Sequence, residues 1–285
     1  MSALRIVAKN CREETEEVRV IKVAVVGVCG RMGTSLVSLA ATDGNIELVG
    51  ATEATGHASI GQCLGDFVPA AGPNVRVSDR IEAAACAADV IIDFTSPDAT
   101  LAHAEYAVRS GKSMVIGTTG FEAEQRGDLL GLLRQIPCVF SPNMSVGVNV
   151  LFEISRQVAS SLGDRYDAEI FETHHRGKED SPSGTAIALA EAVAAGRGLL
   201  LENVARYERH GRIGERGDGE IGIQTLRGGD VVGDHTVMFL GDGERVELSH
   251  RASSRENFSA GAIRAAKWIP GKPPGVYMMR DVLGF

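Results

Sequence analysis

The chain has 285 residues, of which 44% are hydrophobic and 23% charged, and this length supports two hydrophobic cores and therefore two expected domains. Its formal net charge of −8 excludes the broad basic face that nucleic-acid phosphates require, so a local basic cluster is expected to bind a small anion. Five cysteines without CxxC spacing predict neither a disulfide framework nor a zinc site, and they favour a reducing, cytoplasmic location.

The first 19 residues hold only a short apolar-leaning run before the chain becomes acidic. This pattern is typical of neither a signal peptide nor an Arg-rich transit peptide, so we expect a poorly ordered N-terminal extension over residues 1–19. No apolar run approaches the roughly 20 residues that a membrane span needs. We expect a soluble protein with no membrane partner.

From residue 20 to about residue 144, short apolar runs alternate with segments of helical period. The expected strands are VIKVAVV, IELVGAT, VRV, DVIIDFT, SMVIGTT and CVFSP, and the expected helices include RMGTSLVSLAA, DATLAHAEYAVR and AEQRGDLLGLLRQ. Continuous apolar strands separated by helices are typical of a parallel sheet covered on both faces. This part of the chain predicts a doubly wound α/β fold.

After about Asn143 the pattern changes. A long helical segment near 148–161 precedes the alternating run YDAEIFETH, a helix beginning at PSGT, and the segments IGIQTLRGG, DHTVMFLG and ERVELSHRA. These alternating segments predict an open or mixed sheet in a second, α+β domain. The open sheet needs its apolar face covered, which favours oligomerisation. The tail, 256–285, contains one more helix and could pack on either domain.

The first strand leads directly into GVCGRMG, residues 27–33. A strand, a tight turn and a helix in this order bring backbone amides against a pyrophosphate, and Glu53, at the end of the next strand, can accept both ribose hydroxyls. Cys29 replaces the middle glycine of the usual GxGxxG motif. The alternative, a turn that serves only helix packing, is disfavoured by the preceding strand and by Glu53.

Two more loops, FTSP at 94–97 and GTTG at 117–120, follow expected strands. Either could be an ordinary turn, because Gly, Ser and Pro dominate turns. Both, however, fall at the carboxyl ends of parallel strands, the edge where doubly wound sheets bind ligands. Their recurrence at one edge favours a function.

The segment ETHHRGKEDSPSGTA, 172–186, gathers four cationic or imidazole side chains. If the strand continues through Arg176, alternation places His174 and Arg176 on one face and His175 on the other. Neighbouring histidines on opposite faces do not grip one metal ion, so no metal site is predicted. A solvated basic loop is the ordinary alternative.

The sequel to this cluster argues against that alternative. Ser181 is the expected N-cap and Pro182 the expected first residue of a helix whose apolar stripe comprises Ala186, Ile187, Ala190, Val193 and Ala194. Its first turn offers free amides around Ser183, Gly184 and Thr185. A helix N-terminus beside His, Arg and Lys predicts a receptor for a small anion with more than one acidic group.

Seven motifs in order carry a resemblance to the dihydrodipicolinate reductase family, the 4-hydroxy-tetrahydrodipicolinate reductases of bacterial lysine and diaminopimelate synthesis. They are GVCGRMG, DFTSP, GTTGF, NMSVGVN, HHRGKEDSPSGTA, RGGDVVGDHTV and HRASSRENF. HHRxK followed by PSGT is the most specific of them. The resemblance implies a Rossmann-like domain over 20–144 completed by 253–285, and a substrate-binding domain over 145–252 that builds a homotetramer.

The resemblance also implies which residues bind a nicotinamide cofactor. They are Gly27, Val28, Cys29, Gly30, Arg31, Met32, Glu53, Gly117, Thr118, Thr119, Ser141, Pro142, Asn143 and Met144. NADH is expected to be preferred to NADPH or used equally well. Glu53 repels a 2′-phosphate, and Ala54 stands where relatives that accept NADPH well often carry arginine.

For the substrate, a small cyclic dicarboxylate, the resemblance matches His175, Gly184 and Thr185 to binding positions, and Arg176 and Ser183 belong to the same expected anion site. His174 and Lys178 match catalytic positions. Hydride from reduced nicotinamide leaves an enamine that must be protonated. Lys178 is the expected acid, because Arg176 beside it is expected to lower its pKa.

Three features bear on rival functions. Many relatives carry a further basic residue where this chain has Gly177, and this difference leaves open one proton-relay or orienting contact. A semialdehyde dehydrogenase needs a cysteine nucleophile in the second domain, and no cysteine follows Cys138. A redox sensor that binds nicotinamide without turnover is the alternative function, and the intact HHRxK cluster favours the reductase.

Overall fold

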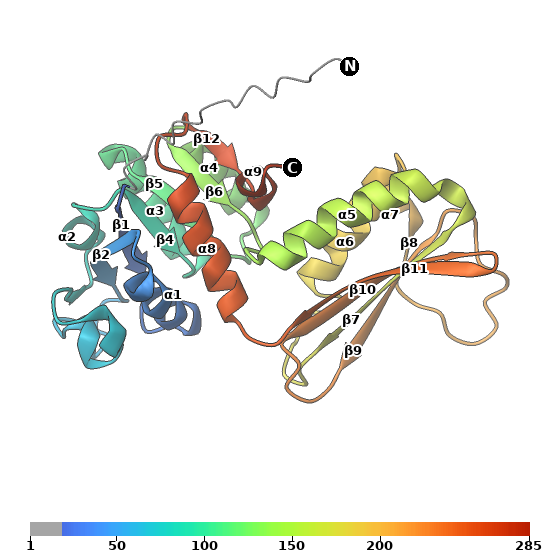
Figure 1. Ribbon diagram of the computed structural model, residues 1–285, viewed down its shortest axis with the longest axis horizontal. Helices are drawn as coiled ribbons and strands as arrows, with labels where there is room; N and C mark the ends of the chain where they lie inside the picture. The colour runs from blue at the N-terminus through green and yellow to red at the C-terminus, as the bar shows by residue number, and fades with distance from the viewer. Residues whose placement is uncertain (1–18) are drawn as a thin grey trace, which may run out of the picture.

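The computed structural model describes residues 19–285, so the predicted extension, apart from Arg19, lies outside the described residues. These residues build two sheets, each with its own helices (Figure 1). One sheet has seven strands in the order β12-β6-β5-β4-β1-β2-β3, and the other has five in the order β11-β10-β7-β9-β8. Between residues 19 and 285, no helix combines the length and apolar character of a bilayer span.

All pairs in the seven-stranded sheet are parallel. Its strands are β1 Ile21–Val26, β2 Ile46–Thr52, β3 Val77–Ser78, β4 Val90–Asp93, β5 Ser113–Ile116, β6 Pro137–Phe140 and β12 Gly275–Tyr277. Its helices are α1 Arg31–Thr42, α2 Ile81–Ala85, α3 Pro97–Ser110, α4 Ala123–Leu133, α8 Glu256–Trp268 and α9 Met279–Leu283, with short 3₁₀ turns at Leu64–Asp66 and Pro69–Ala71.

Helices cover both faces of this sheet, as the apolar strands predicted. Val23 and Val25 of β1 pack in one core cluster with residues of α1 and α8. Ala24 and Val26, which point the other way, pack in a second cluster with residues of α3 and α4. The predicted doubly wound α/β architecture is confirmed.

The residue pattern of the tail did not indicate which domain it packs on, and in the structure it belongs to the seven-stranded sheet. Strand β12 extends the edge in parallel register, Gly275 opposite Pro137 of β6. Helix α8 packs beside α1 (Figure 1). The last segment of the chain, with β12 beginning at Gly275, therefore completes a sheet whose first strand begins at Ile21.

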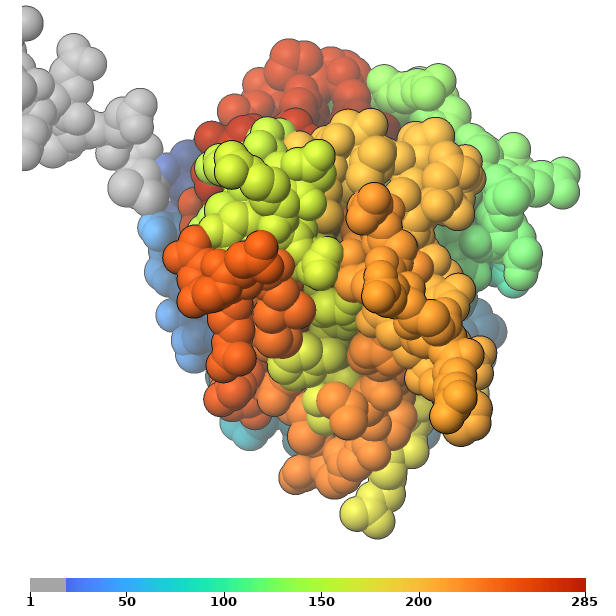
Figure 2. Space-filling model, turned by 90° about the vertical axis from the view of Figure 1, so that its right-hand side faces the viewer, coloured from blue at the N-terminus to red at the C-terminus, as the bar shows by residue number. Residues whose placement is uncertain are grey.

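The five-stranded sheet is mixed: β7 pairs in parallel with β9 and antiparallel with β10. Its elements are α5 Val146–Leu162, a 3₁₀ turn Gly163–Arg165, β7 Asp167–His174, α6 Gly184–Gly196, α7 Leu201–Val204, β8 Ala205–Arg206, β9 Ile221–Arg227, β10 Gly233–Gly241 and β11 Glu244–Ala252. Figure 2 looks onto the end of this body, where yellow-green α5 and gold α6 lie side by side.

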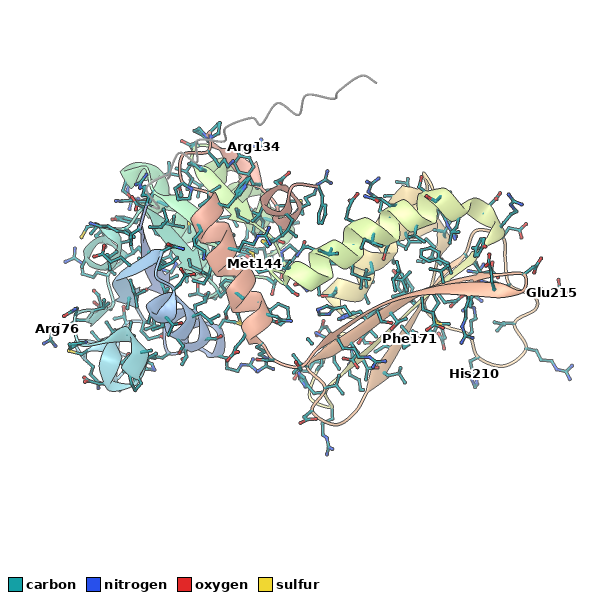
Figure 3. All side chains as sticks on the ribbon, viewed as in Figure 1. Arg76, Arg134, Met144, Phe171, His210 and Glu215 are labelled. Atoms are coloured by element: carbon teal, nitrogen blue, oxygen red, sulfur yellow. The ribbon has the colours of Figure 1, made fainter. Side chains whose placement is uncertain are left out.

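One face of the five-stranded sheet is covered and the other is open. Ala168 and Ile170 of β7 are fully buried in the core beneath α5 and α6. Phe171, which alternation turns to the opposite face, is 37% exposed (Figure 3). The open sheet predicted from the alternating segments is therefore confirmed.

The chain crosses twice between the two bodies, from β6 to α5 and from β11 to α8. The first crossing touches helix α8 at Gly261, where an added Cβ would lie 1.7 Å from the carbonyl oxygen of Met144. Met144 is 1% exposed and lies at the junction of the two bodies (Figure 3). Glycine is required at position 261 so that these backbones can meet.

Candidate active site

A cleft of about 640 Å³ lies where the two bodies meet. Thr119, Gly120, Pro142 and Asn143 line it from the seven-stranded body, and His174, His175, Lys178, Asp180, Ser183, Gly184 and Thr185 line it from the other. A second cavity of about 420 Å³ lies at the carboxyl edge of the seven-stranded sheet and includes Gly27, Gly30 and Glu53. Part of the predicted cofactor site thus lines one hollow, and part of the predicted substrate site lines the other.

Each glycine of the 27–33 loop has a backbone reason. Gly27 has φ +70°, in the left-handed region that favours glycine. Gly30 is the N-cap of α1. A Cβ on Gly33 would lie 2.0 Å from the carbonyl oxygen of Gly27, so only glycine lets the helix approach the turn. The loop therefore presents the start of α1 at the cavity, as an anion-binding turn requires.

Glu53 contacts this loop directly. Its Oε2 accepts a hydrogen bond from the amide of Cys29 at 2.8 Å, and its Oε1 accepts one from the amide of Ala54 at 2.9 Å. Asp79 lines the same cavity, which brings two carboxylates to it. Val28 is fully buried and Arg31 is exposed outside the cavity lining, so the side chains of these two predicted residues do not shape the hollow.

The FTSP loop packs against the GTTG loop and supports it. A Cβ on Gly117 would lie 2.1 Å from the ring of Phe94. The hydroxyl oxygen of Thr118, 3% exposed, accepts a hydrogen bond from the amide of Thr95 at 3.1 Å. Thr118 therefore holds the loop in shape, and Thr119 is the residue of this pair that reaches the cleft.

The segment after β6 joins the two halves of the cleft. The Ser141 hydroxyl donates to the carbonyl oxygen of Asn143 at 2.9 Å, and the Met144 side chain is buried in the core. The Asn143 side chain donates to Oγ1 of Thr185 at 3.0 Å. A residue predicted to bind cofactor thus contacts one predicted to bind substrate.

Strand β7 ends at His174, so the expectation that it continues through Arg176 is wrong. The chain turns because the amide of His175 bonds to the carbonyl of Val231 at 2.8 Å and the amide of Arg176 to that of Gly229 at 3.2 Å. Both histidines line the cleft. Arg176 is exposed and does not belong to the cleft lining.

Helix α6 begins at Gly184, two residues later than predicted. Ser183, not Ser181, is the N-cap, because its hydroxyl oxygen reaches the amide of Ala186 at 3.2 Å. Pro182 precedes the helix instead of opening it, and its bond with Ser181 is a cis peptide. The predicted stripe is otherwise buried in the core, with Leu189 in it and Ile187 at its margin.

Two donors remain available at the start of α6. Within residues 19–285 the amides of Gly184 and Thr185 have no acceptor, and both residues line the cleft. The amide of Ser183 is occupied, since it donates to Oε1 of Glu172 at 3.0 Å. The predicted helix N-terminus therefore lies at the cleft with two free amides instead of three, and its binding of an anion stays a prediction.

Glu172 is a fully buried carboxylate that sequence reasoning missed. It accepts hydrogen bonds from Nδ1 of His174 at 2.5 Å, from both terminal nitrogens of Arg227 at 2.8 and 3.0 Å, and from Thr225 at 3.2 Å. Burial opposes its ionisation, but the bonds from Arg227, His174 and Ser183 outweigh this effect and lower the pKa of Glu172. The carboxylate is ionised.

The imidazoles beside Glu172 are neutral near pH 7. Burial lowers the pKa of His174, although the bond to Glu172 opposes this effect. His235, whose ring centroid lies 5.1 Å from that of His174, is 4% exposed, and burial lowers its pKa to about 3. Its Nε2 lies 3.2 Å from Oγ of the cap residue Ser183.

Lys178 brings an ammonium to the cleft. Its Nζ donates to Oδ1 of Asp180 at 2.8 Å, and its side chain is 22% exposed. Arg255 and Phe258, at the start of α8, line the same cleft. Sequence reasoning placed no role on these two, because nothing local to HRASSRENF indicates that it meets a segment about 80 residues earlier.

Models of the dihydrodipicolinate reductase N-terminus and C-terminus match residues 21–144 and 147–283. The 4-hydroxy-tetrahydrodipicolinate reductase of Anaeromyxobacter dehalogenans (strain 2CP-1) is 51% identical over 263 residues, covering 92% of this chain and 97% of the relative. That of Syntrophobacter fumaroxidans (strain DSM 10017 / MPOB) is 48% identical over 264 residues, covering 93% and 99%.

Among solved structures, the dipicolinate-bound dihydrodipicolinate reductase from Paenisporosarcina sp. TG-14 is 27% identical with a TM-score of 0.73, covering 92% of this chain and 99% of that one. An amine dehydrogenase from Mycobacterium smegmatis, 14% identical with a TM-score of 0.57, shares the fold alone. The two family models together span nearly all of the described residues, in the order that the motifs predicted. The chain belongs to the dihydrodipicolinate reductase family.

Proposed function

We propose that the protein catalyses the NAD(P)H-dependent reduction of 4-hydroxy-tetrahydrodipicolinate to tetrahydrodipicolinate, with loss of the 4-hydroxyl as water, in diaminopimelate and lysine biosynthesis. The observation that carries this proposal is the cleft itself, where His174, Lys178 and the free amides of α6 face the nucleotide-side residues Thr119 and Asn143. A redox sensor without turnover would need the cavity near Glu53 but not an anion site beside a proton donor. A fall in NADH absorbance with freshly generated substrate tests the choice.

The division of labour between the bodies follows the chain. We propose that residues 20–144 with 253–285 hold the cofactor and that residues 145–252 hold the substrate. Supporting this, β12 and α8 belong to the seven-stranded body, which also carries the glycine loop. The start of α6 and the end of β7 carry the anion site.

The residues at the carboxyl edge of the seven-stranded sheet fit a dinucleotide. The positive φ of Gly27, the close approach at Gly33 and the start of α1 suit a pyrophosphate, and Glu53 suits a ribose. When bound, the nicotinamide supplies the hydride. Thr119, Pro142 and Asn143 line the cleft from the cofactor side, where this group would meet the substrate directly.

On the substrate side, the amides of Gly184 and Thr185 hold one carboxylate, with His175 beside them. The Lys178 ammonium attracts the negatively charged substrate. It also donates the proton that the electron-rich product of hydride transfer requires. Asp180 keeps the Lys178 ammonium aimed into the cleft through their 2.8 Å ion pair. We leave Arg176 out of the substrate site because it lies exposed outside the lining.

The first prediction concerns cofactor preference. Glu53 and Asp79 both line the nucleotide cavity, so the negative charge of a 2′-phosphate is disfavoured. We expect kcat/KM with NADH to equal or exceed the value with NADPH. A preference for NADPH above about tenfold, which corresponds to ~1.4 kcal/mol, would contradict this role of Glu53.

The second prediction concerns the anion site. Pyridine-2,6-dicarboxylate, a flat dicarboxylate, is expected to compete with substrate and to bind more weakly to Thr185→Val, which loses the hydroxyl that Asn143 contacts. A loss of roughly 5- to 10-fold fits one hydrogen bond. Calorimetric titration measures it, and Thr236→Val, on β10 and bonded to Ser249, is the control expected to bind normally. Equal affinities in all three proteins would show that the Thr185 hydroxyl takes no part in the anion site.

The third prediction concerns assembly. We propose a homotetramer built through the open face of the five-stranded sheet, where Phe171 and Leu226 are 37% and 52% exposed. Light scattering should give four times the chain mass for the wild type and a lower mass for Phe171→Lys. A wild-type monomer would rule the proposal out.

The fourth prediction separates catalysis from binding at Lys178. If Lys178 is the acid, Lys178→Ala should lower kcat by roughly 10²- to 10⁴-fold, with a smaller rise in KM. NADH affinity should barely change, because Lys178 lies in the other body from the glycine loop.

Lys178→Arg is the sharper variant, because it keeps the charge but its pKa above about 12 makes it a poor donor. Rapid kinetics of both variants, with substrate generated in place, measures these effects. Near-normal kcat in the arginine variant would show that Lys178 only positions the substrate, and the acid role would pass to His174.

A further inference from the structure

The most heavily hydrogen-bonded carboxylate near the cleft belongs to a residue with no role in the chemistry above. Glu172 has no exposed surface and does not itself line the cleft. Its hydrogen-bond partners His174 and Ser183 do. We propose that Glu172 is a positioning residue of the reductase reaction: it fixes the tautomer of His174 and the start of the anion-binding helix α6, and Arg227 balances its charge. This inference rests on the proposed function.

The tautomer of His174 follows from the state of Glu172. An ionised carboxylate has no proton to donate, so the hydrogen in the 2.5 Å contact lies on Nδ1 of His174. The other nitrogen, Nε2, then carries a lone pair. It has no partner among residues 19–285. Because position 233 is glycine, where a Cβ would lie 3.0 Å from Nε2, this nitrogen stays uncovered and able to accept a proton or hydrogen bond.

The same carboxylate anchors the helix. Its second oxygen, Oε1, accepts the amide hydrogen of Ser183 at 3.0 Å and so ties the N-cap residue to β7. The next two amides, of Gly184 and Thr185, are left for the cleft. One carboxylate therefore sets the geometry of the imidazole and of the anion site relative to each other.

Arg227 provides the charge balance from the neighbouring strand β9. Its guanidinium binds both oxygens of Glu172 and also donates to the carbonyl of Asp180 at 2.6 Å. Bidentate pairing of this kind offsets the cost of burying a carboxylate. Asp180 in turn pairs with Lys178, so the network extends to the proposed acid.

The charges that act on His174 come from four elements. Glu172 on β7 raises the pKa of His174, whereas Lys178 in the following loop and Arg227 on β9 lower it. His235 on β10 faces the same ring and is neutral. Removing Glu172 or Arg227 should therefore move the titration of His174 in opposite directions, which a merely structural role would not do.

The experiment compares Glu172→Gln with Arg227→Gln in the full-length protein. Nuclear magnetic resonance of isotope-labelled histidine, assigned with His174→Gln, reports the tautomer and titration of His174 without any turnover. In Glu172→Gln the ring should shift toward the Nε2-protonated tautomer and titrate at lower pH. In Arg227→Gln it should keep the Nδ1-protonated tautomer and titrate at higher pH. Loss of an orienting carboxylate should lower kcat of Glu172→Gln by about 10- to 100-fold, with a smaller change in KM.

Glu169→Gln is the matched control. Glu169 lies on β7 and is ion-paired with Arg209 at 2.7 Å and Arg216 at 3.2 Å, but it points to the open face of the sheet. In the Glu169→Gln variant, the titration of His174 should be unchanged and kcat should stay within roughly twofold of the wild-type value. An unchanged tautomer in Glu172→Gln, or a titration that shifts the same way in both test variants, would overturn the inference. Absence of turnover in the wild type would instead refute the proposed function and leave the resonance measurements interpretable.

Discussion

A close contact between two stretches of backbone positions one wall of the active-site cleft. The chain leaves the seven-stranded body after β6 and returns to it before α8, and the outgoing segment packs on α8 where Gly261 meets the carbonyl of Met144. Asn143, one residue earlier, reaches Thr185 across the cleft, and Arg255 and Phe258, which also line the cleft, lie at the start of α8, a few residues before Gly261. Any side chain at position 261 would push apart segments that together form one wall of the site.

Both bodies place a buried carboxylate at or near the end of a strand and pair it with an imidazole. Asp93 ends β4, is fully buried, and binds Nδ1 of His103 at 2.8 Å, while Glu172 binds His174 near the end of β7. A carboxylate removed from water is stable only when its lone pairs are satisfied. Asp93 therefore shapes the loop at Thr95, whose amide and hydroxyl both donate to it, just as Glu172 shapes the start of α6.

The parts of the site that sequence reasoning predicted are those decided by short stretches of chain. The glycine loop belongs to this group, because left-handed φ at Gly27 and close approach at Gly33 are requirements on single positions. Helix α6 was predicted as an element, but its start was wrong, since both Ser181 and Ser183 satisfy the capping rule and tertiary bonds to Glu172 and His235 favour the second.

What the sequence did not predict depends on pairs far apart in the chain. The end of β7 is decided by loop residues more than 50 positions later, which bond to His175 and Arg176. Arg227 is 55 positions from Glu172, and no periodicity in either strand indicates that the two will meet. The alternation in ETHH places Glu172 and His174 on the same face of β7. A buried acid is uncommon, however, so only the structure establishes that Glu172 is buried.

The two adjacent crossings also bear on how the chain reaches this fold. Pairing β12 with β6 joins Gly275 to Pro137, which closes a loop of 138 residues, the difference between these two positions. The entropic cost of such closure rises with the logarithm of loop length. Once the five-stranded body has formed, its first helix and last strand already lie together, since a Cβ on Gly147 of α5 would lie 2.8 Å from the ring of His250 on β11, so the loop that remains to be closed is short. By holding its own two ends together, the inserted body thus lowers the entropic cost of adding the final strand.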